Sequence, residues 1–341
     1  MNPTKQNEKN PKANKQTESR KKDHVDIVLK KDVQYTQTNG LEKVQFIHNA
    51  LPECDFNKID LSTNFLNKKL QAPILITGMT GGYKDAQWIN QELAKAAQKY
   101  GLAFGLGSQR AMIENPELKK TYDVRSIAPS VPIIANIGAV QLKKYSTGQI
   151  EEMIDAVDAD ALAIHLNALQ EVIQPEGDKD FSGVLSAIEK ACEVLETPII
   201  VKETGAGISD DVAIKLKEIG VAYIDVSGSG GTSWSKVEYQ RGKTVPGFEN
   251  WGNSTFDSLL MCKGILPLIA SGGIRSGIDI AKSITLGADL GGSAYPLIKA
   301  LHEKKLEEKI EEWTNQIRTC MFLTGSKDIE SLKKAKMMIR S

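Results

Sequence analysis

The feature that most constrains the fold is a repeat of eight short apolar runs, each followed by a segment with helical spacing of its apolar residues. Buried strands that alternate with amphipathic helices predict a parallel sheet with crossover helices. The runs are APILITG (72–78), LAFGLG (102–107), PIIANIG (132–138), ALAIHLN (161–167), PIIVKE (198–203), AYIDVSG (222–228), PLIASGG (267–273) and DLGGSA (289–294). Eight such units predict a closed (β/α)8 TIM barrel, whose chemistry lies on the loops that follow the strands.

The chain is longer than a plain barrel of this kind, since it has 341 residues and a plain barrel has about 250. Residues 1–19 are polar and are expected to form a disordered tail. A Lys/Glu-rich region over 303–339 keeps helical spacing of its apolar residues and predicts a C-terminal helical extension. We therefore expect a single catalytic domain over residues 20–341.

Charge and cysteine usage exclude several classes of function. Lys+Arg and Asp+Glu are equal at 43 each, so no basic footprint for nucleic acid or an anionic membrane is indicated. The four cysteines show no CxxC spacing, which argues against a zinc site and a disulfide framework. Residues 1–19 lack the apolar stretch of a signal peptide, and no run is long enough to span a membrane. We expect a cytoplasmic enzyme.

Two segments depart from the repeat and are candidates for function. Residues 20–70 precede the first predicted strand, are mixed and polar, and begin with RKKDH. Residues 228–253 follow the sixth predicted strand as a long loop with many glycines and two tryptophans. A loop of that length at the catalytic face of a barrel is a candidate lid.

Two glycine-rich segments, SGGIRSG (271–277) and GGSAYPL (291–297), stand where the seventh and eighth strands pass into helices. Glycine lets a backbone approach a ligand closely, and free amides at a helix N-terminus attract phosphate. Barrels of this class often bind phosphate at this place. The two segments therefore predict a phosphorylated ligand, with tight turns alone as the alternative.

Lys202 ends the fifth run and is expected to point into the mouth of the barrel. A buried cation requires an anionic partner. A reduced flavin ring is one candidate for that partner, and a salt bridge with Glu203 or Asp225 is another. A lysine that forms a Schiff base with a carbonyl substrate is a third interpretation.

Polar side chains gather after the fourth run, in HLNALQE (165–171). Glu171 suits a hard cation such as Mg²⁺, which takes one or two carboxylates and leaves its other positions to water and phosphates. The segment GLGSQR (105–110) ends in Arg110, whose fork of donors matches a phosphate or diphosphate. The alternatives are a solvated carboxylate for Glu171 and a surface position for Arg110.

Taken together, these segments resemble the type II isopentenyl diphosphate isomerases, which are flavoenzymes built on this barrel. The glycine-rich phosphate loops are common to many flavin barrels, whereas RKKDH (20–24), SQR (108–110) and HLNALQE together are much more specific. The matching segments run in the expected order over residues 20–297: RKKDH, ITGMTGG (76–82), GLGSQR, ANIGAVQL (135–142), HLNALQE, VKETGAGIS (201–209), DVSGSGGTSW (225–234), SGGIRSG and GGSAYPL.

The resemblance implies a role for individual residues. FMN would be held by Gly78, Met79, Thr80, Ser108, Asn136, Lys202, Ser227 and Thr232, and its phosphate by Gly272, Gly273, Arg275, Ser293 and Ala294. The substrate diphosphate would be bound by Arg20, Lys21, Ser108, Gln109, Arg110 and Gln170. Glu171 would bind Mg²⁺. The catalytic candidates near the reacting carbons or the diphosphate are Gln170, His165 and Asn167, with His24 assisting.

The implied reaction interconverts isopentenyl and dimethylallyl diphosphate, which requires a proton added at one carbon and another removed two carbons away. Reduced FMN would act as acid, base and electrostatic partner without net redox, and NADPH would serve only to reduce it beforehand. The resemblance also implies a homo-oligomer, a tetramer or octamer. Its partner is a small diphosphate, with no nucleic acid and no membrane.

Three other functions compete with this one. A flavin-dependent oxidase of 2-hydroxy acids would be expected to place a histidine base near the last strands, and none of the four histidines takes that place after the seventh run. A flavin-free aldolase or isomerase that uses Lys202 would be colourless. A non-enzymatic flavin-binding module would not bind a diphosphate, and the cluster of Arg110, Gln170 and Glu171 argues against it.

Overall fold

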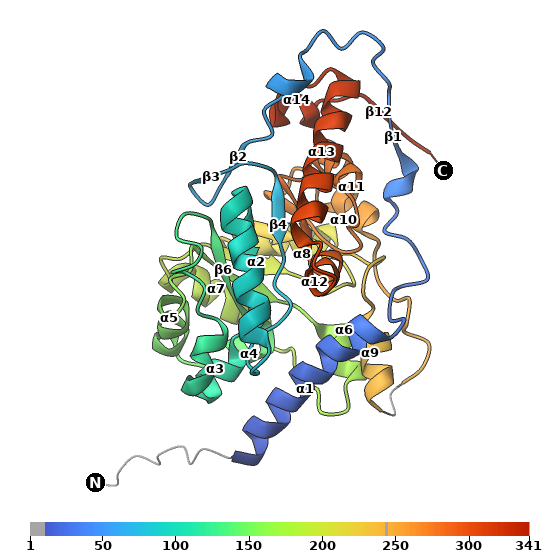
Figure 1. Cartoon of the computed structure of the whole chain (residues 1–341). Coiled ribbons are helices and arrows are strands. Elements are labelled where there is room, and N and C mark those ends of the chain that lie inside the picture. The colour runs from blue at the N-terminus through green and yellow to red at the C-terminus, as the bar shows by residue number, and fades with distance from the viewer. Residues whose placement is uncertain (1–10, 243–244, 341) are drawn as a thin grey trace, which may run out of the picture.

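Eight parallel strands form a closed barrel in the computed structural model, which describes residues 11–242 and 245–340 (Figure 1). The strands are β4 (Ile74–Ile76), β5 (Ala103–Gly105), β6 (Ile133–Gly138), β7 (Ala161–His165), β8 (Ile199–Lys202), β9 (Tyr223–Asp225), β10 (Leu268–Ala270) and β11 (Leu290–Ser293). Each lies within one of the eight predicted runs. They pair in chain order around the ring, and β11 closes onto β4 through Gly291↔Ile74. The predicted (β/α)8 barrel is confirmed.

The interior of the barrel is filled by side chains and is not a pore. Every strand except β9 contributes a buried apolar residue to this inner cluster, and half-buried Tyr223 of β9 packs against it. A larger cluster lies between the barrel and the surrounding helices. Because burial of one such aliphatic side chain stabilises the fold by roughly 1.5–3 kcal/mol, these two layers fix the strand ends that carry the loops.

The helices that follow the barrel strands are α2 (Ala86–Tyr100), α3 (Arg110–Glu114), α4 (Ala139–Leu142), α5 (Thr147–Asp155), α6 (Ala168–Ile173), α7 (Val184–Val194), α8 (Asp210–Glu218), α9 (Trp234–Arg241), α10 (Thr255–Cys262), α11 (Gly277–Leu286) and α12 (Tyr295–His302). The α2 helix shows why the sequence folds this way. Its apolar residues at helical spacing face the core, and Gly101 ends it with φ +62°. Helices of this kind hold the strands in place around the ring.

The N-terminal region forms a helix, α1 (Pro11–Lys30), where a longer polar tail was expected. Residues 11–19 are therefore helical, and residues 1–10 lie outside the described residues. Val25 and Val28, in the second half of α1, are buried, and their packing stabilises this half. The helix then extends toward residue 11, because each residue added to an existing helix forms one more backbone hydrogen bond. The helix lies against α3 and against α9 (Trp234–Arg241), at one end of the molecule (Figure 1).

The segment expected as a long loop over residues 228–253 contains the α9 helix. Ser233 begins this helix, since its side chain accepts a hydrogen bond from the Lys236 amide. Lys236 Nζ donates to the Gln34 carbonyl at 2.6 Å, and the Ser233 amide donates to the Val33 carbonyl at 2.8 Å. The segment is thereby tied to the chain that follows α1.

The remaining elements lie away from α1, at the other end of the molecule (Figure 1). They are the short strands β1 (Val44–Phe46), β2 (Thr63–Phe65), β3 (Lys68–Leu70) and β12 (Met337–Ile339) and the helices α13 (Leu306–Thr324) and α14 (Ile329–Lys333). β1 pairs with β12 and β2 with β3, both antiparallel. The predicted C-terminal helical extension is confirmed, and Leu306, Ile310, Trp313 and Ile317 of α13 are buried.

The α13 helix packs directly on the start of α11. The Gly277 amide donates to Gln316 Oε1 at 2.7 Å. A Cβ added at Gly277 would stand 2.0 Å from the Trp313 carbonyl oxygen, so only glycine permits this approach. Since Gly277 ends the predicted SGGIRSG segment, the C-terminal extension supports that loop.

Candidate active site

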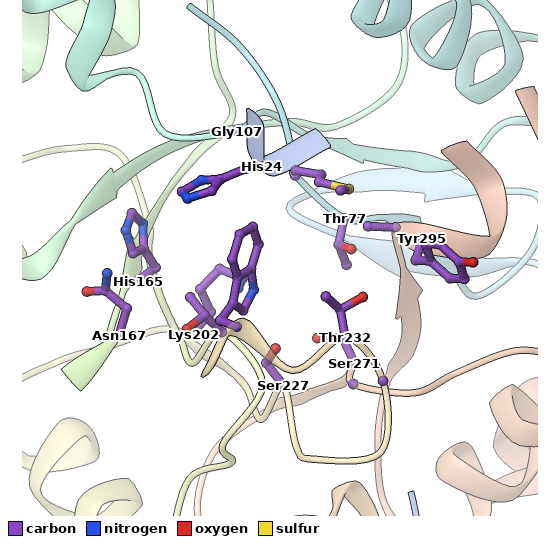
Figure 2. A pocket seen from close by; sticks show the side chains of 18 of the residues that line it. His24, Thr77, Gly107, His165, Asn167, Lys202, Ser227, Thr232, Ser271 and Tyr295 are labelled. Carbon is purple, nitrogen blue, oxygen red and sulfur yellow. The ribbon is translucent and has the colours of Figure 1, made fainter. Parts of the chain in front are cut away.

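A single large cavity lies at the carboxyl ends of the barrel strands, and loops after all eight strands line it together with α1. Figure 2 shows His165, Lys202, Ser227, Thr232 and Ser271 around this space, with His24 reaching it from α1. Every predicted site residue except Gln109 lines the cavity. Segments far apart in the sequence are thus brought to one mouth, as the barrel prediction required.

Gln109 is the exception, because its side chain is fully buried beside the cavity wall. Its Nε2 donates to the Met153 carbonyl at 3.2 Å, and its Oε1 accepts from the Asn136 amide at 2.9 Å. The prediction that Gln109 binds the diphosphate directly is not supported by this placement. Neighbouring residues on the turn after β5 point in different directions, which a motif in the sequence does not reveal.

The loops after β10 and β11 form a wall of backbone groups. The described residues supply no acceptor for the amides of Gly272, Gly273 and Ile274, or for those of Ala294 and Tyr295 at the start of α12. All five residues line the cavity. Unpaired amides near a helix N-terminus are the groups that bind a phosphate dianion.

Glycine in this wall serves loop packing as well as ligand approach. Gly272 has φ +98°, and a Cβ there would stand 2.0 Å from the Gly228 carbonyl oxygen. At Gly273, with φ +70°, a Cβ would stand 2.6 Å from the carbonyl of Gly230. The loops after β9 and β10 therefore touch backbone to backbone. Arg275 completes the wall, and its Nη2 donates to Gln34 Oε1 at 2.8 Å.

A second part of the cavity is lined by cationic side chains. Arg20 and Lys21 come from α1, and Arg110 begins α3. Lys21 Nζ donates to the Ser108 carbonyl at 2.6 Å and lies 2.9 Å from the Tyr122 hydroxyl. Arg110 Nε pairs with Glu114 at 2.6 Å. The Arg110 side chain is half-buried and lines the cavity, so Arg110 is not simply a surface residue.

Burial and neighbouring positive charge lower the pKa of two of these cations, Lys21 and Arg20. Burial, together with neighbouring Arg20, lowers the pKa of Lys21 to about 7. Burial and the nearby Arg110 lower the pKa of Arg20. A bound anion would restore the ordinary values, because an opposite charge favours the charged form. The cluster is therefore suited to a multiply charged anion.

A third group of polar residues lies at the end of β7 and on α6. Asn167 Nδ2 donates to Glu171 Oε1 at 3.0 Å, and the Asp178 amide donates to Glu171 Oε2 at 2.7 Å. Gln170 Nε2 donates to Glu238 Oε1 at 3.1 Å. The carboxylate of Glu171 is thus oriented at the cavity and is not simply solvated.

Sequence reasoning missed the partners that hold this corner together. Glu238 of α9 is fully buried, lies 2.9 Å from His24 Nε2 and pairs with Arg241. Gln174, with its amide oxygen toward Arg20, accepts from Arg20 Nη1 at 3.2 Å and donates to Glu238 at 3.2 Å. No signal in the sequence marked these partners, because the burial of Glu238 and its pairing with distant residues are set by tertiary packing.

Lys202 lies on the floor of the cavity, at the end of β8. Within the described part of the chain it forms no ion pair, and its Nζ donates to the Glu203 carbonyl. The Glu203 carboxylate instead accepts from the amides of Thr204 and Gly205, both at 2.6 Å, and Asp225 accepts from Ser271 Oγ at 2.6 Å. The predicted alternative of a salt bridge with Glu203 or Asp225 is not observed.

Comparisons with known proteins agree with this geometry. The model of the FMN-dependent dehydrogenase family matches residues 159–339. The isopentenyl-diphosphate delta-isomerase of Nostoc sp. is 47% identical over 331 residues, which cover 93% of this chain and 95% of that protein. The protein of the same name from Pyrococcus furiosus is 46% identical over 334 residues, which cover 92% and 85%. The chain belongs to the isopentenyl-diphosphate delta-isomerase family.

Membership in the isopentenyl-diphosphate delta-isomerase family confirms the resemblance seen in the sequence. The match to an FMN-dependent domain supports FMN as the cofactor. Within the described residues, no helix is both long and apolar enough to cross a membrane.

Solved structures show how widely the fold of this isomerase family is shared. A lactate oxidase of Pediococcus acidilactici superposes with a TM-score of 0.69 at 17% identity, covering 97% of this chain and 94% of that one. A flavocytochrome b2 variant gives a TM-score of 0.67 at 19% identity, covering 87% and 76%. Identity this low shows the fold alone. The His302 ring, at the end of α12, meets the Trp88 ring edge to face and does not line the cavity.

The cavity fits the cofactor that the family uses. Thr80 Oγ1 is buried in the wall and is unpaired among the described residues, as is Asn167 Oδ1. Together with the unpaired amides after β10 and β11, these atoms need ligand partners. No group of three or more His, Cys, Asp or Glu residues that could hold a metal occurs in the described ranges. A Mg²⁺ ion here would therefore depend on Glu171, water and a phosphorylated ligand.

Proposed function

We propose that this isomerase interconverts isopentenyl and dimethylallyl diphosphate with reduced FMN and Mg²⁺ and without net redox, and that NADPH serves only to reduce the flavin. The observation that carries the proposal is that one cavity has two separate parts suited to anions, a wall of unpaired amides and a cluster of cations. The amides after β10 and β11 suit the phosphate of FMN. The cluster of Arg20, Lys21 and Arg110 suits a diphosphate.

The flavin would lie between these parts, along the loop after β4 and over Lys202. Gly78, Met79, Thr80, Ser108 and Asn136 would contact it from the early strands, and Ser227 and Thr232 from the loop after β9. Gly272, Gly273, Arg275, Ser293 and Ala294 would hold its phosphate. When bound and reduced, FMN supplies an electron-rich ring that can exchange a proton and stabilise positive charge nearby. Lys202 would favour an anionic ring, because the described residues give its ammonium no ion pair.

The substrate diphosphate would be bound by Arg20, Lys21, Ser108 and Arg110, with Gln170 near the reacting carbons or the diphosphate. Gln109 would act from behind the wall, since it does not reach the cavity. Glu171 would bind Mg²⁺ together with the diphosphate. A Mg²⁺ ion can be bound by one carboxylate, with phosphate and water as its other ligands. Asn167 fixes the Glu171 carboxylate by a 3.0 Å hydrogen bond and would thereby hold this carboxylate ready to bind the metal.

Proton transfer would take place in a space closed against water. α1 and α9 together form one side of the cavity, and the His24 ring meets the Trp234 indole edge to face at 5.2 Å between centroids. Buried contacts between Glu238, His24 and Gln170 join this cover to α6. Exclusion of water protects a developing positive charge on the substrate from being trapped. His165 and Gln170 are the candidates that position or move protons there.

The test uses enzyme loaded with FMN that is reduced photochemically under anaerobic conditions, with Mg²⁺ and without nicotinamide. We expect many turnovers of isopentenyl diphosphate, with deuterium from D₂O incorporated into dimethylallyl diphosphate. Nicotinamide consumed in proportion to turnover would contradict the absence of net redox. Failure of the reduced holoenzyme to convert either five-carbon diphosphate would contradict the proposal as a whole.

A further inference from the structure

Gln109 was predicted to bind substrate, and its actual contacts suggest a different task. It is completely buried between the turn after β5 and the strand β6. Its own amide donates to the Asn136 carbonyl at 2.8 Å, while its side-chain Oε1 accepts from the Asn136 amide at 2.9 Å. A single residue therefore satisfies both backbone groups of Asn136, as a neighbouring strand would.

The orientation of the Gln109 amide group is fixed at its other end as well. Nε2 donates to the Met153 carbonyl of α5 at 3.2 Å. A carbonyl can only accept, so the nitrogen must face Met153 and the oxygen must face Asn136. Because both ends are specified and no solvent reaches the group, the backbone of Asn136 is held in one place.

The side chain of Asn136 passes this constraint to His165. Asn136 Oδ1 lies 2.8 Å from His165 Nδ1, across the neighbouring strands β6 and β7. An amide oxygen can only accept a hydrogen bond, so the proton of this pair belongs to Nδ1. His165 Nε2 then carries a lone pair, and no described residue donates to it.

The charges around His165 keep the ring neutral. Burial is the main cause that lowers the pKa of His165 to about 3, and the ammonium groups of Lys202 on β8 and Lys21 on α1 lower it further. The ring is therefore uncharged near neutral pH, and its tautomer decides what it can bind.

We infer that Gln109 is a positioning residue, which acts through Asn136 to hold His165 as the neutral Nδ1–H tautomer with Nε2 open to the cavity as an acceptor. Such a nitrogen receives a proton or binds a hydrogen-bond donor, and it repels a phosphate oxygen. The sequence analysis left two positions open for His165, near the reacting carbons or near the diphosphate. An unprotonated Nε2 favours the position near the reacting carbons. The tautomer is a property of the free chain, and only its kinetic consequence rests on the proposed function.

The experiment records imidazole ¹⁵N–¹H correlations of the full-length protein, with and without FMN, at neutral pH. Only four histidines occur, so comparison with His165→Gln assigns the signal. We expect wild-type His165 to be a single Nδ1–H tautomer. Gln109→Met, which keeps the length of the side chain and removes its hydrogen bonds, should give a mixture in which the Nε2–H form is detectable.

The matched control is Gln98→Met on α2, where Gln98 binds Ser130 at the surface. This variant makes the same chemical change and should leave the His165 signal as in wild type. A folded Gln109→Met protein with an unchanged Nδ1–H signal would mean that Gln109 has a structural role only. A wild-type His165 that is protonated or carries Nε2–H at neutral pH would overturn the inference outright.

Asn136→Asp keeps the test decisive if Gln109→Met does not fold. A carboxylate at this position also accepts from Nδ1–H, so the tautomer should persist while the pKa of His165 rises. A switch to Nε2–H in this variant would contradict the inference. In turnover, Gln109→Met should lower kcat more than it raises KM for the diphosphate. If Gln109→Met loses the single tautomer but the wild type shows no isomerase activity, the proposed function is refuted and the positioning role of Gln109 stands.

Discussion

The two anion-binding parts of the cavity are built in opposite ways. The wall after β10 and β11 offers unpaired backbone amides, and its glycines pack against the loop after β9. The cationic cluster offers long side chains, two of them on α1 and one on the short helix α3. The first part presents backbone amides, whereas the second contains Arg20 and Lys21, whose pKa values are lowered by burial and by neighbouring positive charge. A cofactor that stays bound suits the first, and a substrate that comes and goes suits the second.

The largest effect should come from a methyl group placed in the backbone wall. Gly272→Ala brings a Cβ to 2.0 Å from the Gly228 carbonyl at φ +98°, so the two loops must separate, at a cost of about 3 kcal/mol. We expect FMN affinity to fall roughly 100-fold, measured by fluorescence titration of the flavin-free protein.

The control for this substitution is Gly148→Ala in α5, where a Cβ would meet nothing within 4 Å. That variant should bind FMN normally and gain up to about 1 kcal/mol of stability, since alanine favours the helix. Normal FMN retention by Gly272→Ala would show that loop packing does not set the amide positions.

Removal of one cation should affect the substrate and spare the cofactor. Lys21→Met should weaken diphosphate binding roughly 10- to 100-fold, as expected for loss of a charge-assisted hydrogen bond. FMN content should be unchanged. Lys22→Met is the matched control because Lys22 is the exposed neighbour on the same helix. Equal effects of the two variants on isopentenyl diphosphate KM would argue that only net charge matters.

The Mg²⁺ requirement of the enzyme should depend on the Glu171 carboxylate, which lines the cavity with the cationic cluster. Glu171→Gln keeps the size of the side chain and removes its charge, so the Mg²⁺ concentration needed for half-maximal activity should rise roughly 10-fold. Flavin absorbance per protein should stay the same. Loss of flavin with unchanged Mg²⁺ dependence would mean that the two parts of the cavity are assigned the wrong way round.

The smallest expected effect is the uptake of a proton by Lys21 when a diphosphate binds. Without an anion the pKa of Lys21 is about 7, so Lys21 is largely neutral at pH 8. A bound diphosphate favours the ammonium form and raises this pKa, so binding should take up a proton, approaching about one per site. Calorimetry in buffers of different ionisation enthalpy measures the uptake. Proton release, or equal uptake by Lys21→Met, would rule out this lysine as the titrating group.

The same lysine affects the pH dependence of folding, and the sign follows from its lowered pKa. Between pH 7 and the ordinary lysine range the unfolded chain binds more protons at Lys21 than the folded chain does. The lowered pKa of Lys21 therefore destabilises the folded chain by its full amount below about pH 7, and this penalty is relieved as pH rises from about 7 to the ordinary lysine range. Lys21→Met should flatten this part of the profile in thermal unfolding experiments.

The eight strands and the glycine wall could be predicted from sequence because both have local signals. Apolar runs are short and regular, and glycine pairs at strand ends mark backbone conformations that other residues disfavour. α1 could not be predicted in this way. Its stabilising contacts are long-range, since Val25 and Val28 are buried by segments far away in the chain.

Motifs identified the correct segment more reliably than the correct side chain. SQR is one motif, yet Ser108 and Arg110 face the cavity while Gln109 points into the core. Glu238 carried no motif, although it contacts His24, Gln170 and Arg241. Direction on a turn and pairing between distant segments depend on tertiary packing, which spacing along the chain does not encode.

The contact between Gly277 and α13 links the C-terminal extension to the retention of the flavin. A helix outside the barrel ring anchors the residue that follows Arg275 and Ser276, so displacement of Trp313 or Gln316 would shift the phosphate loop without touching any ligand. Exchanging this helix for one from another barrel would therefore change flavin retention, even though every residue around the flavin stayed the same.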